Sequence, residues 1–165
     1  MIITNPVGID AEIQRLQQRF TANLFSGKNY TSHGRAFLNV RDDGIVPEVY
    51  LGSDEYEEVL LNDSLDAMSF FTVDPSMGIQ GKESKAKVDI YFFCNLSTLF
   101  ACTHRATEEV HILVLTEIDK TPFQVTGLVQ GSECVRDFTI RNPELLDMQP
   151  FYCFKFECLI TYKLC

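Results

Sequence analysis

The clearest pattern in the chain is the alternation of apolar and polar side chains in residues 151–165 (FYCFKFECLITYKLC). Successive side chains of a β-strand point to opposite faces of a sheet, so this stretch is predicted to be one long strand running to the last residue. Its apolar face would hold Tyr152, Phe154, Phe156, Cys158, Ile160, Tyr162 and Leu164. Its polar face would hold Lys155, Glu157, Thr161 and Lys163. A strand this long can pair beyond its own domain, and its polar face suits water or a neighbouring subunit.

Two segments have the period of an amphipathic helix. The first covers residues 9–24, and its apolar face would consist of Ile9, Ile13, Leu16, Phe20 and Leu24. Asp10 is the expected N-cap of this helix. The second covers residues 106–120 and ends before Pro122, with Ala106, Val110, Leu113, Val114 and Glu117 to Ile118 at helical spacing. His111 would lie on the polar flank of this second helix.

Shorter apolar runs predict the remaining strands. Residues 35–40 and 45–51 flank the turn 42–44 (DDG) and form a predicted hairpin. Pro47 lacks a backbone donor, so its strand is expected at a sheet edge or with a bulge there. Further strands are predicted at 69–73, 88–99, 123–129 and 134–140, with a helical turn at 142–148.

This order of elements predicts an α+β fold: a mostly antiparallel sheet with two amphipathic helices packed on one face. The length of 165 residues suits a single domain spanning residues 1–165.

Two polar segments are candidates for contact with other molecules. The predicted loop 75–86 is long and polar, and its contact candidates are Gly78, Gln80, Lys82, Glu83 and Lys85. The acidic run contributes Asp54, Glu55, Glu57 and Glu58, which are expected on a solvated face or on an edge that forms salt bridges with a neighbour.

Charge and cysteine content narrow the classes of function. The net charge of −9 disfavours a surface built to grip nucleic acid. No stretch is apolar enough to span a bilayer, so we expect no membrane partner. The six cysteines lie mostly in strand-like apolar runs, and the start of the chain does not read as a secretion signal. We therefore expect reduced thiols.

No complete catalytic or metal-binding motif is found. Residues 78–82 (GIQGK) lack the spacing of a phosphate-binding loop. Cys102, His104 and His111 lack the paired spacing typical of zinc ligands, and Cys153 and Cys158 would point to opposite faces of one strand. His33, on a predicted loop, is the best candidate for a general base. We expect no enzyme activity and no cofactor, and the alternative is a small cytoplasmic ligand-binding or catalytic α+β domain.

The order of elements resembles that of the ring-forming neck and tail-completion (tail-terminator-like) proteins of tailed bacteriophages. The resemblance rests on the opening helix IDAEIQRLQQRF, the strand run GRAFLNVRDDGIVPEVYLG, the link DEYEEVLLNDSLDAMSFFTV, the helix ATEEVHILVLTEI and the closing strand FECLITYKL. It implies a virion structural protein, assembled in the host cytoplasm, that forms a homo-oligomeric ring. The implied partners are other copies of the chain and other neck or tail proteins, with DNA passing nearby without specific binding.

Overall fold

The computed structural model describes residues 4–74, 78–101, 106–146 and 148–164. Its helices are α1 (Ile9–Arg19), which the π-helix η1 (Phe20–Leu24) extends, α2 (Leu96–Leu99), α3 (Ala106–Ile118) and the 3-10 turns η2 (Gly131–Val135) and η3 (Pro143–Leu145). Its strands are β1 (Tyr30–Arg41), β2 (Gly44–Gly52), β3 (Glu55–Glu58), β4 (Ala67–Asp74), β5 (Ile79–Gln80), β6 (Glu83–Asn95), β7 (Gln124–Gln130) and β8 (Phe151–Lys163).

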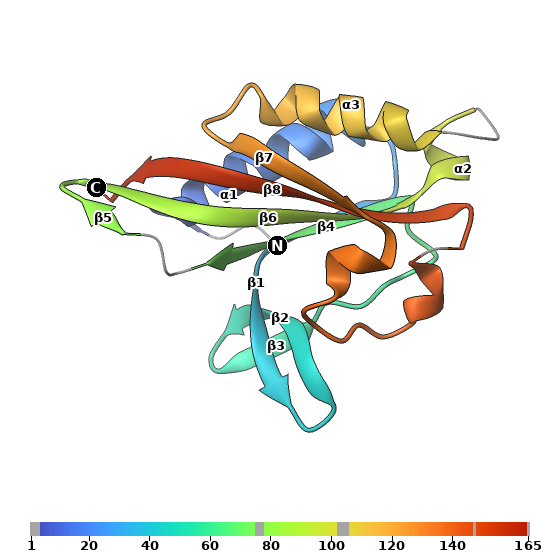
Figure 1. Cartoon of the computed structure of the whole chain (residues 1–165), viewed down its shortest axis with the longest axis horizontal. Helices are drawn as coiled ribbons and strands as arrows, with labels where there is room; N and C mark the ends of the chain where they lie inside the picture. Colours follow the sequence, from blue (N-terminus) through green and yellow to red (C-terminus); the bar gives the residue numbers. More distant parts are fainter. Residues whose placement is uncertain (1–3, 75–77, 102–105, 147, 165) are drawn as a thin grey trace.

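The strands form one sheet in the order β3-β2-β1-β4-β6-β8-β7, and β5 pairs with β6 (Figure 1). Every pairing is antiparallel except that of β1 with β4, which is parallel. The expected α+β class with a mostly antiparallel sheet is therefore confirmed. The predicted hairpin is also confirmed, because β1 and β2 pair from Arg41 and Gly44 back to Ala36 and Val49.

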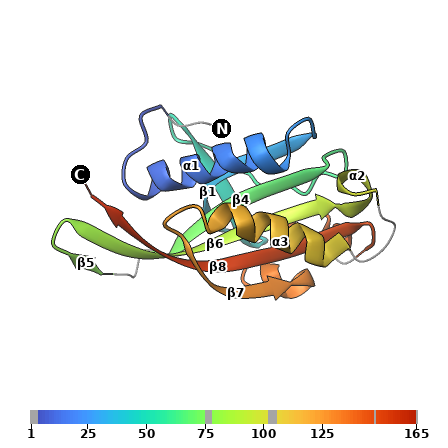
Figure 2. The ribbon, with the colours of Figure 1, turned by 90° about the horizontal axis from the view of Figure 1, so that it is seen from above.

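The larger core lies between the sheet and the helices α1 and α3, which lie above the sheet in Figure 1 and in front of it in Figure 2. α1 contributes Ile13 and Leu16, and α3 contributes Val110, Val114 and Ile118. β8 adds Tyr152, Phe154, Phe156, Cys158 and Ile160, which is the face that its alternation predicts. Rings meet closely there: those of Phe92 and Phe154 stack with centroids 5.1 Å apart. Because each buried ring removes a large apolar area from water, this layer holds the helices on the sheet.

A second core lies on the other face of the sheet. Met68, Phe70, Tyr91 and Phe93 from β4 and β6 pack there against Val135, Phe138, Ile140 and Leu146 from the segment between β7 and β8. The strand predicted at 134–140 is wrong, because this segment begins as η2 and continues without a strand partner in the described residues. Residues 143–145 form the predicted helical turn as η3.

Several local predictions are corrected by the structure. Gly8, not Asp10, is the N-cap of α1, and Asp10 instead pairs with Arg35 at 3.2 Å. Pro47 lies inside a sheet between β1 and β3, without a bulge at that residue. Val59 donates its backbone N–H to the Pro47 carbonyl, so the Pro47 nitrogen also faces Val59, just past the end of β3. Because Val59 lies past the end of β3, the N–H that Pro47 lacks removes no hydrogen bond between β2 and β3.

Two segments predicted to be loop or solvated stretch are strands. Residues 55–58 form β3 at one edge of the sheet. Residues 79–80 and 83–86 belong to β5 and β6, joined by a tight turn in which Gly81 has a φ of +65°. A glycine tolerates this left-handed conformation, so a hairpin replaces most of the predicted loop. Residues 75–77 of that loop lie outside the described residues.

Candidate functional site

The structure brings the predicted loop 75–86 and the polar face of β8 together. Strand β8 pairs with β6 so that Lys163 lies opposite Glu83 and Thr161 lies opposite Lys85. The β5–β6 turn at Lys82 is tied to the end of β8, because the Leu164 amide donates to the Lys82 carbonyl at 3.0 Å. We call β5, residues 83–87 of β6 and residues 159–163 of β8 the distal ribbon; it forms the end of the molecule on the left of Figure 1.

The distal ribbon is rich in lysine. Lys82 and Lys85 are exposed, and neither takes part in an ion pair with another described residue. Lys87 faces Glu157 at 3.8 Å. Gly78 accepts a backbone hydrogen bond from Lys85 at 3.3 Å, which closes the base of the hairpin. The ribbon therefore presents positive charge on a subunit whose net charge is −9.

The acidic run lies elsewhere, at the opposite edge of the sheet. Asp54, Glu55 and Glu57 are exposed in and beside β3, which pairs with β2 on one side only. Glu58 differs from the other three, because it forms an ion pair with Arg141 at 3.0 Å. The Tyr56 ring packs on Tyr50, with centroids 5.1 Å apart, and so stiffens this short strand.

Lys155, predicted to face water or a neighbour, is buried. Its side chain is 8% exposed, and its Nζ donates to Asp89 Oδ2 at 2.9 Å and lies 3.5 Å from Glu157. It also sits over the Tyr91 ring, 5.5 Å from the centroid. Burial opposes the positive charge, but the hydrogen bond to Asp89 and the charge interactions with Tyr91, Asp89 and Glu157 together outweigh it and raise the pKa of Lys155 above its ordinary value. The charge of Lys155 is therefore paired within the subunit and does not face a neighbour.

A groove opens where β1 leaves the main sheet. β1 pairs with β4 only from Tyr30 to Arg35, and then continues to Arg41 with β2 alone. In Figure 1, β1, β2 and β3 project below the rest of the sheet as a result. The space between β1 and the ends of β4 and β6 is a groove of about 810 Å³. Phe37 and Leu38 of β1 and Lys85 and Lys87 of the distal ribbon are among its lining residues. Three acidic residues line it as well: Asp74, Asp89 and Asp137.

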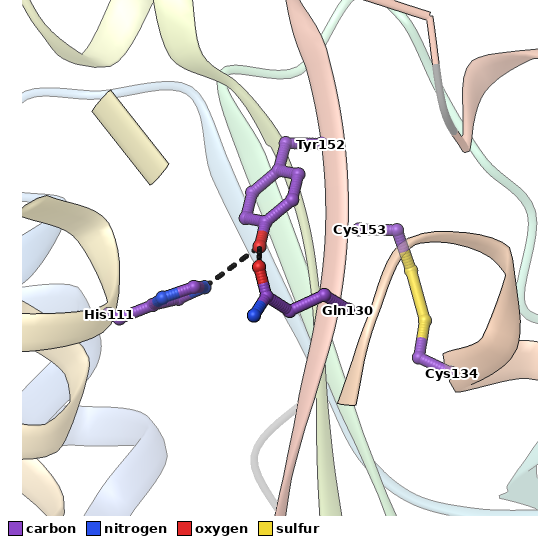
Figure 3. Close-up of a disulfide and its surroundings, with 5 residues drawn as sticks. All are labelled: His111, Gln130, Cys134, Tyr152 and Cys153. Carbon is purple, nitrogen blue, oxygen red and sulfur yellow. Dashed lines mark hydrogen bonds between the residues drawn. A yellow bond between two sulfur atoms is a disulfide. The ribbon is translucent and has the colours of Figure 1, made fainter. Parts of the chain in front are cut away.

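A disulfide joins the segment between β7 and β8 to the sheet. Cys134 in η2 is bonded to Cys153 in β8, as Figure 3 shows, so the expectation of reduced thiols is wrong for this pair. Cys94 and Cys158 are free and buried. Cys153 and Cys158 point to opposite faces of β8, as predicted: Cys153 lies in the second core and Cys158 in the helix-side core. Cys102 and Cys165 lie outside the described residues.

A buried polar network lies beside this disulfide. The Tyr152 hydroxyl donates to Gln130 Oε1 at 2.7 Å and lies 3.0 Å from His111 Nε2 (Figure 3). Only 8% of His111 is exposed, so its predicted place on the polar flank of the helix is wrong. Burial lowers the pKa of His111 and raises that of Tyr152 to about 12. Both groups are therefore neutral near pH 7, and the network serves to join α3 to β7 and β8.

The candidates for catalysis and metal binding are dispersed. His33 lies in β1, not in a loop, and burial lowers its pKa. His104 lies outside the described residues, as does Cys102. In the part of the chain that the structure describes, no three His, Cys, Asp or Glu side chains are grouped so as to hold a metal ion. No described helix combines the length and apolar character needed to cross a membrane.

Comparisons with protein families, with curated proteins and with solved structures found no match to this chain.

Proposed function

We propose that this protein is a virion structural protein, one subunit of a homo-oligomeric ring in the head-to-tail connector or tail-completion region of a tailed phage. The observation that carries the proposal is the separation of charge on one subunit. The acidic strand β3 lies at one edge of the sheet, while the lysines of the distal ribbon border the groove beyond β1. The phage assignment itself rests on the resemblance in the order of elements.

A ring of identical subunits requires two different patches that complement each other, because each copy contacts its neighbours head to tail. β3 and the groove meet this requirement, because they differ in shape and in charge. β3 carries exposed carboxylates only, whereas the groove is lined by basic and acidic residues together. Opposite charges also speed the encounter of two copies and disfavour the wrong pairings. In this proposal α1 and α3 cover one face of the sheet, and Ile9 at the start of α1 also lines the groove.

The acidic balance of the chain also fits a ring around a path for DNA. A subunit of net charge −9 offers few counter-charges to phosphate, so DNA would slide through without specific binding. Lys82 and Lys85 would hinder such sliding if they lined the channel. The proposal therefore directs the distal ribbon towards neighbouring copies or other neck or tail proteins.

Electron microscopy of the purified protein, combined with native mass spectrometry, tests the proposal. We expect closed rings of one defined copy number with a central opening wide enough for duplex DNA. The monomer has a mass of 18.8 kDa, so each copy number gives a distinct mass. A protein that stays monomeric at 18.8 kDa at concentrations up to about 100 µM, well above the dissociation constant expected of a specific complex, would contradict the proposal.

A further inference from the structure

The three strands β1, β2 and β3 carry an open edge on each side. β3 is the last strand of the sheet, so its outer edge has no strand partner among the described residues. On the other side, residues 36–41 of β1 no longer pair with β4, and residues 36–39 border the groove instead. We call this stretch the β1 edge.

The hydrogen-bond register shows which backbone groups are free at these edges. Val59 N–H bonds to the Pro47 carbonyl, so Pro47 points towards β3 and away from its partner Leu38. Bonded and non-bonded pairs alternate along an antiparallel ladder. The N–H and C=O groups of Leu38 and Val40 therefore point out of the β1 edge, and those of Tyr56 and Glu58 point out of β3.

The β1 edge has the character of a surface that is covered in the assembled protein. Leu38 is 42% exposed, Val40 is 81% exposed, and Phe37, the residue before Leu38, is 39% exposed. Residues 36–40 (AFLNV) contain no proline and no charge. A long, apolar, unprotected edge strand pairs readily with any other open strand, and proteins normally block such edges. The absence of a block indicates that a specific strand covers this edge.

Charge identifies that strand. The β1 edge is bracketed by Arg35 and Arg41, whereas β3 carries Glu55 and Glu57 on exposed positions. Two copies of β3 would place like charges opposite each other, and two antiparallel β1 edges would place Arg35 opposite Arg41. Only the unlike pairing of β3 with the β1 edge sets acidic against basic residues. Arg35 and Arg41 also pair with Asp10 and Glu48 of their own chain. Across the groove, Lys85 is exposed, Lys87 faces Glu157, and the lining also includes Asp74, Asp89 and Asp137.

We propose that β3 of a second copy of this chain enters the groove and pairs with the β1 edge, so that strands β3-β2-β1 continue from copy to copy around the ring. This inference rests on the proposed function and names the contact that builds the ring. It is a strand addition in which main-chain hydrogen bonds join the copies and the charges select the partner.

Two variants, each disabling one edge, test this contact. Leu38→Glu puts a carboxylate on the β1 edge, where the incoming β3 is already acidic. Tyr56→Pro removes an N–H that points out of β3 without removing a hydrogen bond to β2, a substitution that edge strands tolerate. The matched control is Leu113→Glu, because Leu113 on α3 is also 42% exposed and lies away from both edges. Far-UV circular dichroism with thermal unfolding checks that each variant folds.

Native mass spectrometry then separates the possible results. We expect rings for the unaltered protein and for Leu113→Glu, and monomers for Leu38→Glu and Tyr56→Pro separately. An equimolar mixture of these two variants should give a dimer of twice 18.8 kDa and no ring, because one intact β3 meets one intact β1 edge. Rings that persist in both variants would overturn this inference and leave the proposed function standing. A mixture that stays monomeric would also overturn it, and an unaltered protein that never assembles would overturn both.

Discussion

Replacing Lys155 with methionine should destabilise the protein strongly, although the residue lies in a strand face that looks solvent-exposed from the sequence. The Lys155 ammonium is 2.9 Å from an oxygen of Asp89, and the other oxygen of Asp89 is buried without a hydrogen-bond partner in the described residues. At that distance and an effective dielectric constant of about 20, Coulomb's law gives an attraction of about 6 kcal/mol. Desolvation cancels much of this, and removing one partner of a buried pair costs about 3–5 kcal/mol.

The assay is urea unfolding followed by far-UV circular dichroism at one protein concentration, because assembly adds stability of its own. We expect Lys155→Met to lower the free energy of unfolding by about 3 kcal/mol or more, since it leaves the Asp89 carboxylate without its partner. Asp89→Leu should cost less, because Lys155 keeps Glu157 at 3.5 Å. The double variant should lie within about 1 kcal/mol of the unaltered protein, because an apolar pair replaces the ion pair. Glu157 keeps Lys87 as a partner in every variant. A loss below about 1 kcal/mol for Lys155→Met, or additive losses in the double variant, would refute the reasoning.

Two further predictions concern the segment beside the disulfide. Burial lowers the pKa of His111 below its ordinary 6.5, so the unfolded chain binds more protons and stability falls as the pH drops from about 6.5 to 5. His111→Phe should reduce this pH dependence of the free energy of unfolding, measured by urea unfolding at several pH values. An unchanged pH dependence would contradict the role of His111 and assign the loss to His33, whose pKa is also lowered by burial. The Cys134–Cys153 disulfide closes a loop with a sequence separation of 19, so dithiothreitol should cost the oxidised protein about 3 kcal/mol. Dithiothreitol should not change the free energy of unfolding of Cys134→Ser. An equal loss of stability in both proteins would contradict this account.

Periodicity predicted an element well where only one of its faces is apolar. In β8 the alternation assigns Phe154 and Phe156 to the helix-side core and Cys153 to the other face, and the structure agrees. It also agrees for Ile13 and Leu16 of α1. The polar residues between these positions leave a single orientation that buries apolar area, so the local pattern is sufficient.

The same reasoning failed for α3, which is apolar on nearly all sides. Leu113 was expected inside and is 42% exposed, whereas His111 was expected on the flank and is 8% exposed. The sequence around them, VHILVL, offers several faces of similar hydrophobicity. The choice between them depends on Tyr152 and Phe154 of β8, which receive the His111 ring. A contact between residues so far apart in the chain cannot be predicted from the hydrophobic periodicity of α3 alone.

Register between distant strands accounts for the misplacement of Lys155. Its predicted exposure follows from the polar pattern of β8 alone, but β6 places Tyr91 directly opposite it and Asp89 opposite Glu157. A lysine can be buried when such partners surround it, and the sequence does not show which strand lies alongside. The same register brings Thr161 and Lys163 to Lys85 and Glu83, so one pairing both removes a residue from the predicted surface and creates the distal ribbon.

β1 separates from β4 after Arg35, and no local pattern in the sequence indicated this separation. The proposed role of the polar segments depends on it. Had β1 stayed with β4 beyond Arg35, its apolar residues Leu38 and Val40 would be paired inside the sheet, and β3 would be the only open edge on that side. One open acidic edge could bind other molecules, but it could not generate a ring, which needs two unlike edges on each copy. Because β1 diverges, the subunit acquires a second open edge beside the groove, with the uncharged residues 36–40 between Arg35 and Arg41. In the proposed ring, the negative charge of β3 would repel β3 of another copy and favour pairing with the β1 edge of the next copy.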